Sequence, residues 1–195
     1  MNQNDEVEEK IILAALHVID TEGLEAATVR RIAEVAGVNV AAISYYFRGK
    51  KRLFERSFQR SLSNAFNFQD FAKTEHAGPK ERLIDILDGV CAMALRFPGL
   101  AQAHFNEPLF KGDYSGYSMQ RVSSFLDEIV QDLTPRYSQP PNPDELRVAL
   151  AQIISATLVV ASILPGFPIF ACGLDISNPE IRKTWLSGIV EKILC

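Results

Sequence analysis

The chain has 195 residues, 47% of them hydrophobic, so it can bury a core as one domain, or as a small domain joined to a larger one. Its net charge of −4 argues against a protein that is basic throughout, and its polar, acidic start is unlike a secretory signal. The few cysteines and histidines are scattered, without a disulfide framework or a metal-ligand spacing. We therefore expect a cytoplasmic protein that holds no metal and no cofactor.

Hydrophobic periodicity favours helices along nearly the whole chain, and no run alternates as strands do. In chain order, we expect helices over residues 6–20, 28–36, 40–46, 50–72, 80–96, 119–133, 144–164 and 179–194. Residues 98–118 are rich in glycine, proline and aromatics and are expected to be irregular. The polar stretch KTEHAGPKE, residues 73–81, is the expected boundary. We predict an all-α chain with an N-terminal unit over 1–50, a linking helix to about 72 and a larger helical unit over 73–195.

The stretch VALAQIISATLVVASIL, residues 148–164, is apolar enough to suggest a membrane span. Polar side chains interrupt it at Gln152, Ser155, Thr157 and Ser162, and Pro165-Gly166 ends it. A span needs about 20 mostly apolar residues. We therefore expect a buried helix and no membrane partner.

Two short helices are expected to meet at a glycine within RIAEVAGVNVAAISYYF, residues 31–47. Thr28 can cap the first helix and Asn39 the second, because each side-chain oxygen can accept a backbone N–H that the helix leaves unbonded. Gly37 supplies a turn conformation that residues with a β-carbon resist. Two short helices joined by such a turn form a helix-turn-helix.

Positive charge gathers in this part of an otherwise acidic chain. Residues 30–60 carry a charge of about +6, which comes from Arg30, Arg31, Arg48, Lys50, Lys51, Arg52, Arg56 and Arg60 against Glu34 and Glu55. A phosphate-binding face needs charge concentrated in this way. The alternative is a basic helix surface that is simply solvated.

Two further features of the same region point to a binding surface. Arg30 and Arg31 lie in the first turn of their helix, where cations oppose the helix dipole. Two cations in a helix turn that disfavours them suggest a functional site. DNA phosphates and a guanine edge could compensate for this unfavourable placement. Tyr45 and Tyr46 could each direct a hydroxyl to a phosphate while the ring packs. Plain core packing beside Phe47 is the alternative for both tyrosines.

The segment TVRRIAEVAGVNVAAISYYFRGKKRLF, residues 28–54, resembles the DNA-binding signature of the TetR family of transcriptional regulators. The family pattern is roughly T-x-x-x-I-A-x-x-A-G-V-x-x-x-x-L/I-Y-Y-H/Y-F-x-x-K-x-x-L. The matches are Thr28, Ile32, Ala33, Ala36, Gly37, Val38, Ile43, Tyr45, Tyr46, Phe47, Lys50 and Leu53. The resemblance covers roughly the first 60 residues, and the rest shares only length, helical pattern and arrangement.

The resemblance implies roles for particular residues. Contacts to phosphates are implied for Thr28, Tyr45, Tyr46 and Lys50, and a contact to a base in the major groove for Arg30. The implied recognition helix carries Asn39, Val40, Ala41, Ala42 and Ser44. The family often has tyrosine at position 44, and Val40, Ala41 and Ala42 have almost no side-chain hydrogen-bonding capacity. Base reading should then depend on Arg30, Asn39, Ser44 and methyl contacts to thymine.

The two last helices are expected to form the dimer interface, as a four-helix bundle across a twofold axis that also resembles the family. The expected interface residues are Leu158, Trp185, Ile189 and Ile193. The alternative is that both helices fill an intrachain core. An effector pocket is expected from a set of mainly aromatic residues: Met93, Phe97, Gln102, His104, Phe105, Phe110, Tyr114, Tyr117 and Phe125. Core packing explains most of these equally well.

These observations favour a cytoplasmic, homodimeric regulator that binds a double-stranded DNA operator and responds to a small, mainly apolar or aromatic effector. Most members of the family are repressors. The alternative is a helical ligand-binding module that no longer reads DNA specifically, supported by the apolar recognition helix. An enzyme is not expected, because no nucleophile–base pair, phosphate loop or metal spacing appears in the sequence.

Overall fold

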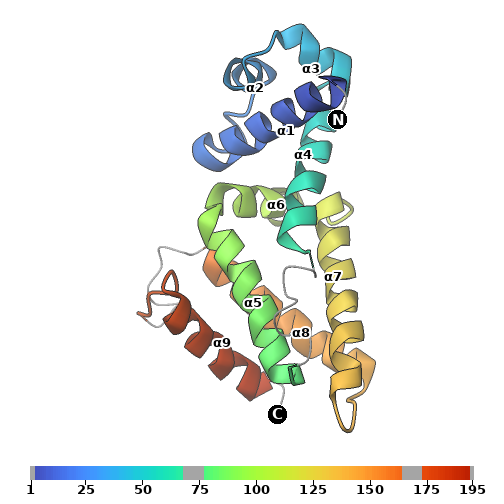
Figure 1. The fold of residues 1–195 in the computed structure, drawn as a ribbon, viewed down its shortest axis with the longest axis vertical. Coiled ribbons are helices and arrows are strands. Elements are labelled where there is room, and N and C mark those ends of the chain that lie inside the picture. The colour runs from blue at the N-terminus through green and yellow to red at the C-terminus, as the bar shows by residue number, and fades with distance from the viewer. Residues whose placement is uncertain (1–2, 68–76, 164–172, 194–195) are drawn as a thin grey trace. The chain divides into compact units, whose positions relative to one another are not determined.

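The structure is a computed structural model that describes residues 3–67, 77–163 and 173–193. No strand occurs in these ranges, which confirms the all-α prediction. The helices, drawn in Figure 1, are α1 (Gln3–Glu22), α2 (Val29–Ala36), α3 (Val40–Phe47), α4 (Lys50–Ala65), α5 (Pro79–Arg96), α6 (Pro98–Lys111), α7 (Tyr117–Leu133), the short η2 (Thr134–Arg136), α8 (Pro143–Leu158), the π-helical η3 (Val159–Ile163) and α9 (Pro179–Ile193).

The chain divides into two compact units. The N-terminal unit contains Met1–Asn64 together with Gly99–Met119, and the C-terminal unit contains Ala65–Pro98 together with Gln120–Cys195. The first unit thus holds α1 to α4 and nearly all of α6. Residues 68–72, the predicted end of the linking helix, lie outside the described residues, and α4 ends at Ala65. The boundaries predicted at 50 and 73 stay a prediction.

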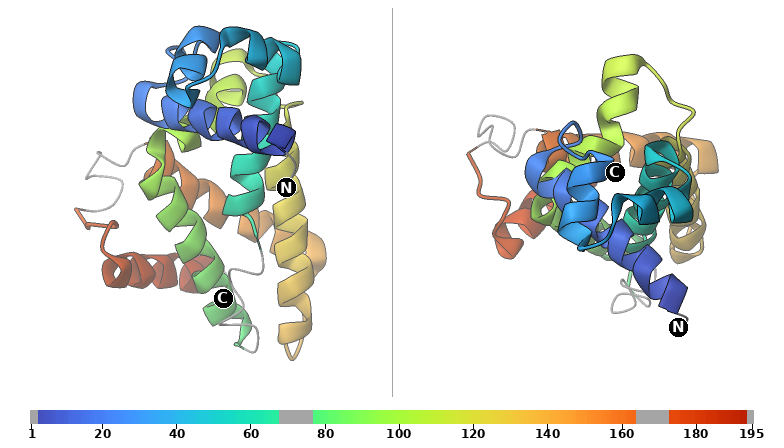
Figure 2. Two further views of the ribbon diagram at one scale, coloured as in Figure 1. Left: turned by 45° about the horizontal axis from the view of Figure 1, so that its top comes forward. Right: turned by 90° about the horizontal axis from the view of Figure 1, so that it is seen from above.

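The core of the N-terminal unit is built from one apolar face of each of its first four helices. Helix α1 packs against α2, and α2 packs against α3 (Figure 2). Apart from Ser57, the fully buried side chains are aliphatic or aromatic, as the helical periodicity predicts, and include Ile11, Ile19, Ile32, Ile43, Phe47 and Leu53. This core holds the two short helices in place, because helices of eight residues are marginal without tertiary packing.

The expectation of an irregular stretch over residues 98–118 is wrong for its first part. Pro98 begins α6 instead of only ending α5, because proline is well suited to the first turn of a helix. The Asp20 carboxylate on α1 accepts the backbone N–H of Leu100 at 3.1 Å and so caps the new helix. Pro108 lies inside α6 without ending it, and the helix runs to Lys111.

The C-terminal unit is a packed group of helices in which α5, α8 and α9 contact one another (Figure 1). Its core is aliphatic and includes Leu83, Ile86, Leu87, Ile129, Leu150, Ile153, Leu186 and Val190. Two buried arginines pair with carboxylates on other helices, Arg82 with Asp132 at 2.9 Å and Arg182 with Asp88 at 2.7 Å. These pairs fix α5 to α7 and α5 to α9, because losing one partner would leave a buried charge uncompensated.

Helix α8 begins as the sequence predicts, with the side chain of Asn142 accepting the backbone N–H of Asp144 at 2.8 Å. The predicted helix over 144–164 continues beyond Leu158 as a π-helix to Ile163, and residue 164 lies outside the described residues.

Within the described ranges, Pro143–Ser162 is long and apolar enough to cross a membrane by length and composition alone, and 44% of its most apolar window is buried. This is weak evidence for a span, since the core helix of a soluble protein passes the same test.

Candidate nucleic-acid interface

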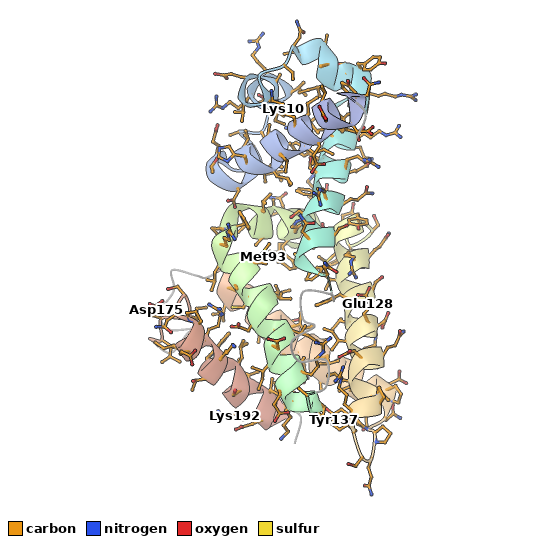
Figure 3. The ribbon with its side chains drawn as sticks, in the orientation of Figure 1. Lys10, Met93, Glu128, Tyr137, Asp175 and Lys192 are labelled. Carbon is orange, nitrogen blue, oxygen red and sulfur yellow. The ribbon has the colours of Figure 1, made fainter. Side chains whose placement is uncertain are left out.

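The turn between α2 and α3 has the geometry that its glycine predicts. Gly37 is left-handed, with φ 61° and ψ 39°, and its N–H bonds the carbonyls that end α2. The next residue, Val38, donates its N–H to the Ala33 carbonyl at 3.0 Å. The nearest side-chain atom that a β-carbon on Gly37 would meet is Nζ of Lys10, at 3.7 Å (Lys10 is labelled in Figure 3). The backbone conformation, not crowding, therefore requires glycine here.

Both predicted caps are confirmed. Thr28 Oγ1 accepts the N–H of Arg31 at 3.1 Å, and Asn39 Oδ1 accepts the N–H of Ala41 at 2.9 Å. Each cap residue is exposed and keeps a donor, the hydroxyl of Thr28 and the side-chain amide of Asn39. Both can therefore cap a helix and bind DNA at the same time.

Helix α3 turns one face to the core and the other to solvent. Ile43 and Phe47 are buried, whereas Ala41 and Ser44 are exposed and Ala42 is half-buried. Val40, at the start of the helix, is 42% exposed. The first turn of the solvent-facing side of α3 is thus apolar, and the hydroxyls of Ser44 and Tyr45 follow it. The apolar part suits methyl contacts better than a dense set of hydrogen bonds.

The two tyrosines that close α3 differ in their surroundings. Tyr45 is 76% exposed, so core packing does not explain it. Tyr46 is half-buried, and its hydroxyl donates to Asn4 Oδ1 on α1 at 3.2 Å. The rings meet edge to face, with centroids 5.1 Å apart. Tyr45 therefore presents its hydroxyl and most of its side chain to solvent, whereas Tyr46 also ties α3 to the start of α1.

Three of the basic residues between 30 and 60 are paired within the N-terminal unit. Arg31 pairs with Glu22 at 2.8 Å and with Glu34 at 3.0 Å, and the hydrogen bond from Arg31 to Glu22 lowers the pKa of Glu22. The other two pairs join α4 to α1 and are Arg56–Glu8 at 3.1 Å and Arg60–Glu9 at 2.9 Å. The acids that Arg31 contacts compensate for its position in the first turn of α2, so the argument from the helix dipole holds only for Arg30.

The other five cations form a distinct group, which we call the open cations. Arg30, Arg48, Lys50, Lys51 and Arg52 are all exposed, and none forms an ion pair within the described part of the chain. Lys50 lies over the ring of Phe54, 4.9 Å from its centroid. Sequence reasoning counted Arg48, Lys51 and Arg52 as charge and assigned them no contact. The signal that could have found them is their position in FRGKKR, which runs from the last residue of α3 into the first turn of α4.

A hollow of about 390 Å³ lies between α1 and α4 in the same unit. Its lining is mostly charged or polar and consists of Asp5, Glu8, Glu9, Ile12, Arg56, Gln59, Arg60 and Ser63. The ion pairs of Arg56 and Arg60 lie across it. None of the residues predicted to bind an effector lines this hollow.

The residues predicted to bind an effector occur in both units. Met93, Phe97 and Phe125 belong to the C-terminal unit, and the other six, Gln102, His104, Phe105, Phe110, Tyr114 and Tyr117, to the N-terminal unit. Met93 is half-buried on α5 (Figure 3), Phe125 is buried and stacks on Phe66 with centroids 4.4 Å apart, and Phe110 is 80% exposed. Their grouping into one pocket stays a prediction.

His104 is the most constrained member of this set. Its Nδ1 lies 2.9 Å from Ser118 Oγ and its Nε2 lies 3.3 Å from Ser61 Oγ, on α7 and α4. Its ring is 4.7 Å from that of Phe58. Burial lowers the pKa of His104 to about 4, so the ring is neutral at pH 7. A neutral ring between two hydroxyls holds α6 to α4.

The residues predicted to form the dimer interface differ in how deeply they are buried within the single chain. Leu158 is buried, whereas Trp185, Ile189 and Ile193 on α9 are partly exposed. Helix α8 also exposes apolar surface, with Val148 59% exposed. Partly exposed apolar side chains on two adjacent helices leave room for a further packing partner.

Comparisons with known proteins agree with this description. A model of the family "Bacterial regulatory proteins, tetR family" matches residues 11–56, which contain α2, α3 and the open cations. The chain is 37% identical over 84 residues to the HTH-type transcriptional regulator BetI 1 of Chromohalobacter salexigens, covering 41% of this chain and 40% of BetI 1. It is 28% identical over 123 residues to the nucleoid occlusion factor SlmA of Mannheimia succiniciproducens, covering 62% of this chain and 56% of SlmA.

These alignments span about half the length of the curated relatives. Solved structures extend the similarity of fold over the whole chain. A transcriptional regulator of Rhodococcus sp. Rha1 matches with a TM-score of 0.69 at 19% identity, covering 96% of this chain and 95% of that one. A TetR-family regulator from Rhodococcus sp. matches with a TM-score of 0.70 at 16% identity, covering 98% and 100%.

The fold defines a helix-turn-helix domain followed by a larger helical unit. Residues 11–56, which hold α2 and α3, match the TetR family of bacterial regulatory proteins, and curated regulators resemble this part of the chain. The solved structures extend the similarity of fold, and the fold alone, over the rest of the chain.

Proposed function

We propose that the protein represses transcription as a cytoplasmic homodimer, by binding a double-stranded DNA operator from which a small effector releases it. The observation that carries the DNA-binding part is the group of open cations beside the exposed face of α3. Five exposed cations that form no ion pair with another described residue, in a chain whose net charge is −4, fit a polyanionic partner.

In this proposal three hydroxyl groups and one lysine fix the protein on the DNA backbone, and few groups read bases. Thr28, Tyr45, Tyr46 and Lys50 contact phosphates. Arg30 donates to a guanine edge, and Asn39 and Ser44 offer further hydrogen bonds. Val40, Ala41 and Ala42 contact thymine methyl groups. Exposure of Val40 supports such contacts, since nothing in its own unit covers the side chain fully.

A gel shift tests the DNA-binding part. The probe is DNA from just upstream of the protein's own gene, titrated with salt against unrelated DNA of the same length. A specific shift that weakens steeply as salt rises, and that Arg30→Ala abolishes, supports an operator-reading regulator. Weak binding to both probes alike would favour the alternative, a helical ligand-binding module, for which the apolar face of α3 is the supporting observation.

The dimer is proposed to form through α8 and α9, in which Trp185, Ile189 and Ile193 add to the exposed apolar surface of α8. A twofold axis through these helices would carry two recognition helices, which would fit successive major grooves about 34–36 Å apart.

The effector is proposed to be mainly apolar or aromatic, because aromatic residues dominate the set predicted to bind it. A thermal-shift screen tests this part. Stabilisation by apolar or aromatic compounds, with release of the DNA probe at the same concentrations, is the expected result. Stabilisation by highly charged metabolites alone would contradict the proposed chemistry.

A further inference from the structure

Arg48 has a left-handed backbone conformation, which the other described residues show only where the residue is glycine. Its φ is 57°, and it is the sole non-glycine residue with positive φ in the described ranges. The other positive values belong to Gly23, Gly37, Gly49, Gly112 and Gly173. A left-handed conformation brings the β-carbon of an L-residue close to the following carbonyl oxygen, so glycine is the favoured residue here.

The contacts of Arg48 do not explain why an arginine occupies this position. Its backbone N–H bonds the Ser44 carbonyl and ends α3, a bond that glycine would make equally well. Its side chain is exposed and forms no hydrogen bond or ion pair that the described structure records. Side-chain bonding to the described residues therefore does not compensate for the strain.

The position of Arg48 suggests what compensates for this strain. The residue lies between Tyr46, near the end of α3, and Lys50, which begins α4. Tyr46 and Lys50 are both proposed to contact phosphates, so Arg48 lies within the same surface. Backbone strain of this kind is concentrated at functional sites, where the strained residue has a use outside the fold.

We propose that Arg48 is a further DNA-contacting residue, which binds a backbone phosphate at the corner between α3 and α4. The inference rests on the proposed function and adds a contact to it. The guanidinium donates charge-assisted hydrogen bonds to the phosphate oxygens and carries no sequence information. One competing explanation is that the cation only stabilises the C-terminal end of α3 through the helix dipole.

Replacing Arg48 with glycine separates the two explanations. Arg48→Gly removes the charge and also removes the backbone strain, so a phosphate contact predicts weaker DNA binding by a protein at least as stable as the wild type. Each phosphate contact contributes about 0.9 to the slope of log K against log salt. The variant should lose about 0.9 of that slope, which corresponds to roughly eightfold weaker binding at 0.1 M salt.

The experiment measures salt-dependent binding of the full-length protein to its upstream DNA, together with the midpoint of thermal unfolding. Arg48→Lys keeps the cation and should keep the slope. Lys80→Ala, which removes one cation from the C-terminal unit, should leave slope and affinity unchanged. If Arg48→Gly melts below the wild type, Arg48→Asn replaces it, because asparagine tolerates the left-handed region.

Three results would overturn the proposal. An unchanged slope in Arg48→Gly, with wild-type binding intact, would leave the DNA-binding regulator standing and remove Arg48 from its contacts. An unchanged slope in a stable Arg48→Asn, with lower stability of Arg48→Gly, would assign the arginine to the end of α3. Absence of salt-dependent binding by the wild type itself would overturn the proposed function, and this inference with it.

Discussion

Arg31 and Glu22 form a forked ion pair, in which Nε and Nη2 of Arg31 donate to the Glu22 carboxylate at 3.0 and 2.8 Å. Arg30, one residue earlier, is exposed and has no acidic partner among the described residues. Two adjacent arginines thus have different surroundings. We expect Arg30→Ala to reduce the preference for operator over unrelated DNA, by about 1–3 kcal/mol if Arg30 reads a guanine.

Arg31→Ala is the matched control for this variant, since it removes the same charge from the same turn of α2. It should lower the melting temperature slightly, because Glu22 and Glu34 lose their partner, and should leave the ratio of operator to unrelated binding unchanged. Binding titrations on both DNA probes measure that ratio. Equal loss of sequence preference in both variants would contradict the assignment of base reading to Arg30.

Gly37 provides a test of the helix-turn-helix turn. Gly37→Ala places a β-carbon on a residue with φ 61°, which should destabilise the protein by about 1–2 kcal/mol. Gly37→Asn should cost less, because asparagine tolerates this conformation. Urea unfolding measures both variants. The same loss for alanine and asparagine would mean that crowding, and not the backbone angle, requires glycine.

Gly99 tests the contact between α6 and α1. A β-carbon on Gly99 would lie 2.2 Å from the backbone carbonyl oxygen of Asp20, so the two helices must separate to admit it. Gly99→Ala should destabilise the protein by about 1–3 kcal/mol, as overpacking does. Gly116→Ala is the control, because its β-carbon would meet only a Glu107 side-chain oxygen at 3.6 Å. Similar unfolding free energies for both variants would contradict this close approach.

His104 should make stability depend on pH. The pKa of His104 is lowered by burial to about 4, whereas histidine in an unfolded chain titrates near 6.5. Between these values the unfolded chain takes up a proton that the folded chain does not, so stability falls as the pH falls through this window. The full contribution is of the order of 3 kcal/mol and is present above about pH 6.5.

Comparison with His104→Gln isolates this contribution from that of the carboxylates. Glutamine can still bond Ser61 or Ser118 but does not titrate. Its unfolding free energy, measured in urea from pH 7.5 to 4.5, should decline less than that of the wild type. Parallel profiles for the two proteins would show that His104 is not held neutral by its surroundings.

Local signals in the sequence were enough to predict the helix-turn-helix. Thr28, Gly37 and Asn39 act on backbone groups within four residues of themselves, so sequence spacing alone specifies their bonds. The periodic apolar face then predicts which side of each helix is buried. This part of the candidate site could therefore be predicted before the structure, although the DNA contacts stay predictions.

Contacts between distant residues could not be predicted in this way. Pro98-Gly99 indicated only the end of a helix, and the carboxylate that caps α6 belongs to Asp20, 80 residues away along the chain. Of the two acids that pair with Arg31, Glu22 lies on the preceding helix. Sequence charge alone could therefore not separate the open cations from the paired ones.

Val148 tests the proposed dimer. The side chain is 59% exposed in the single chain, so Val148→Asp should leave the folded subunit intact. In a dimer through α8 and α9 the new carboxylate would be buried without a partner, which costs about 3 kcal/mol or more and weakens association over 100-fold. Sedimentation equilibrium should then give 21.7 kDa for the variant and twice this mass for the wild type. Leu174→Asp is the control, because Leu174 is 42% exposed and lies outside these two helices. This variant should remain dimeric. A dimeric Val148→Asp would exclude this face of α8 from the interface.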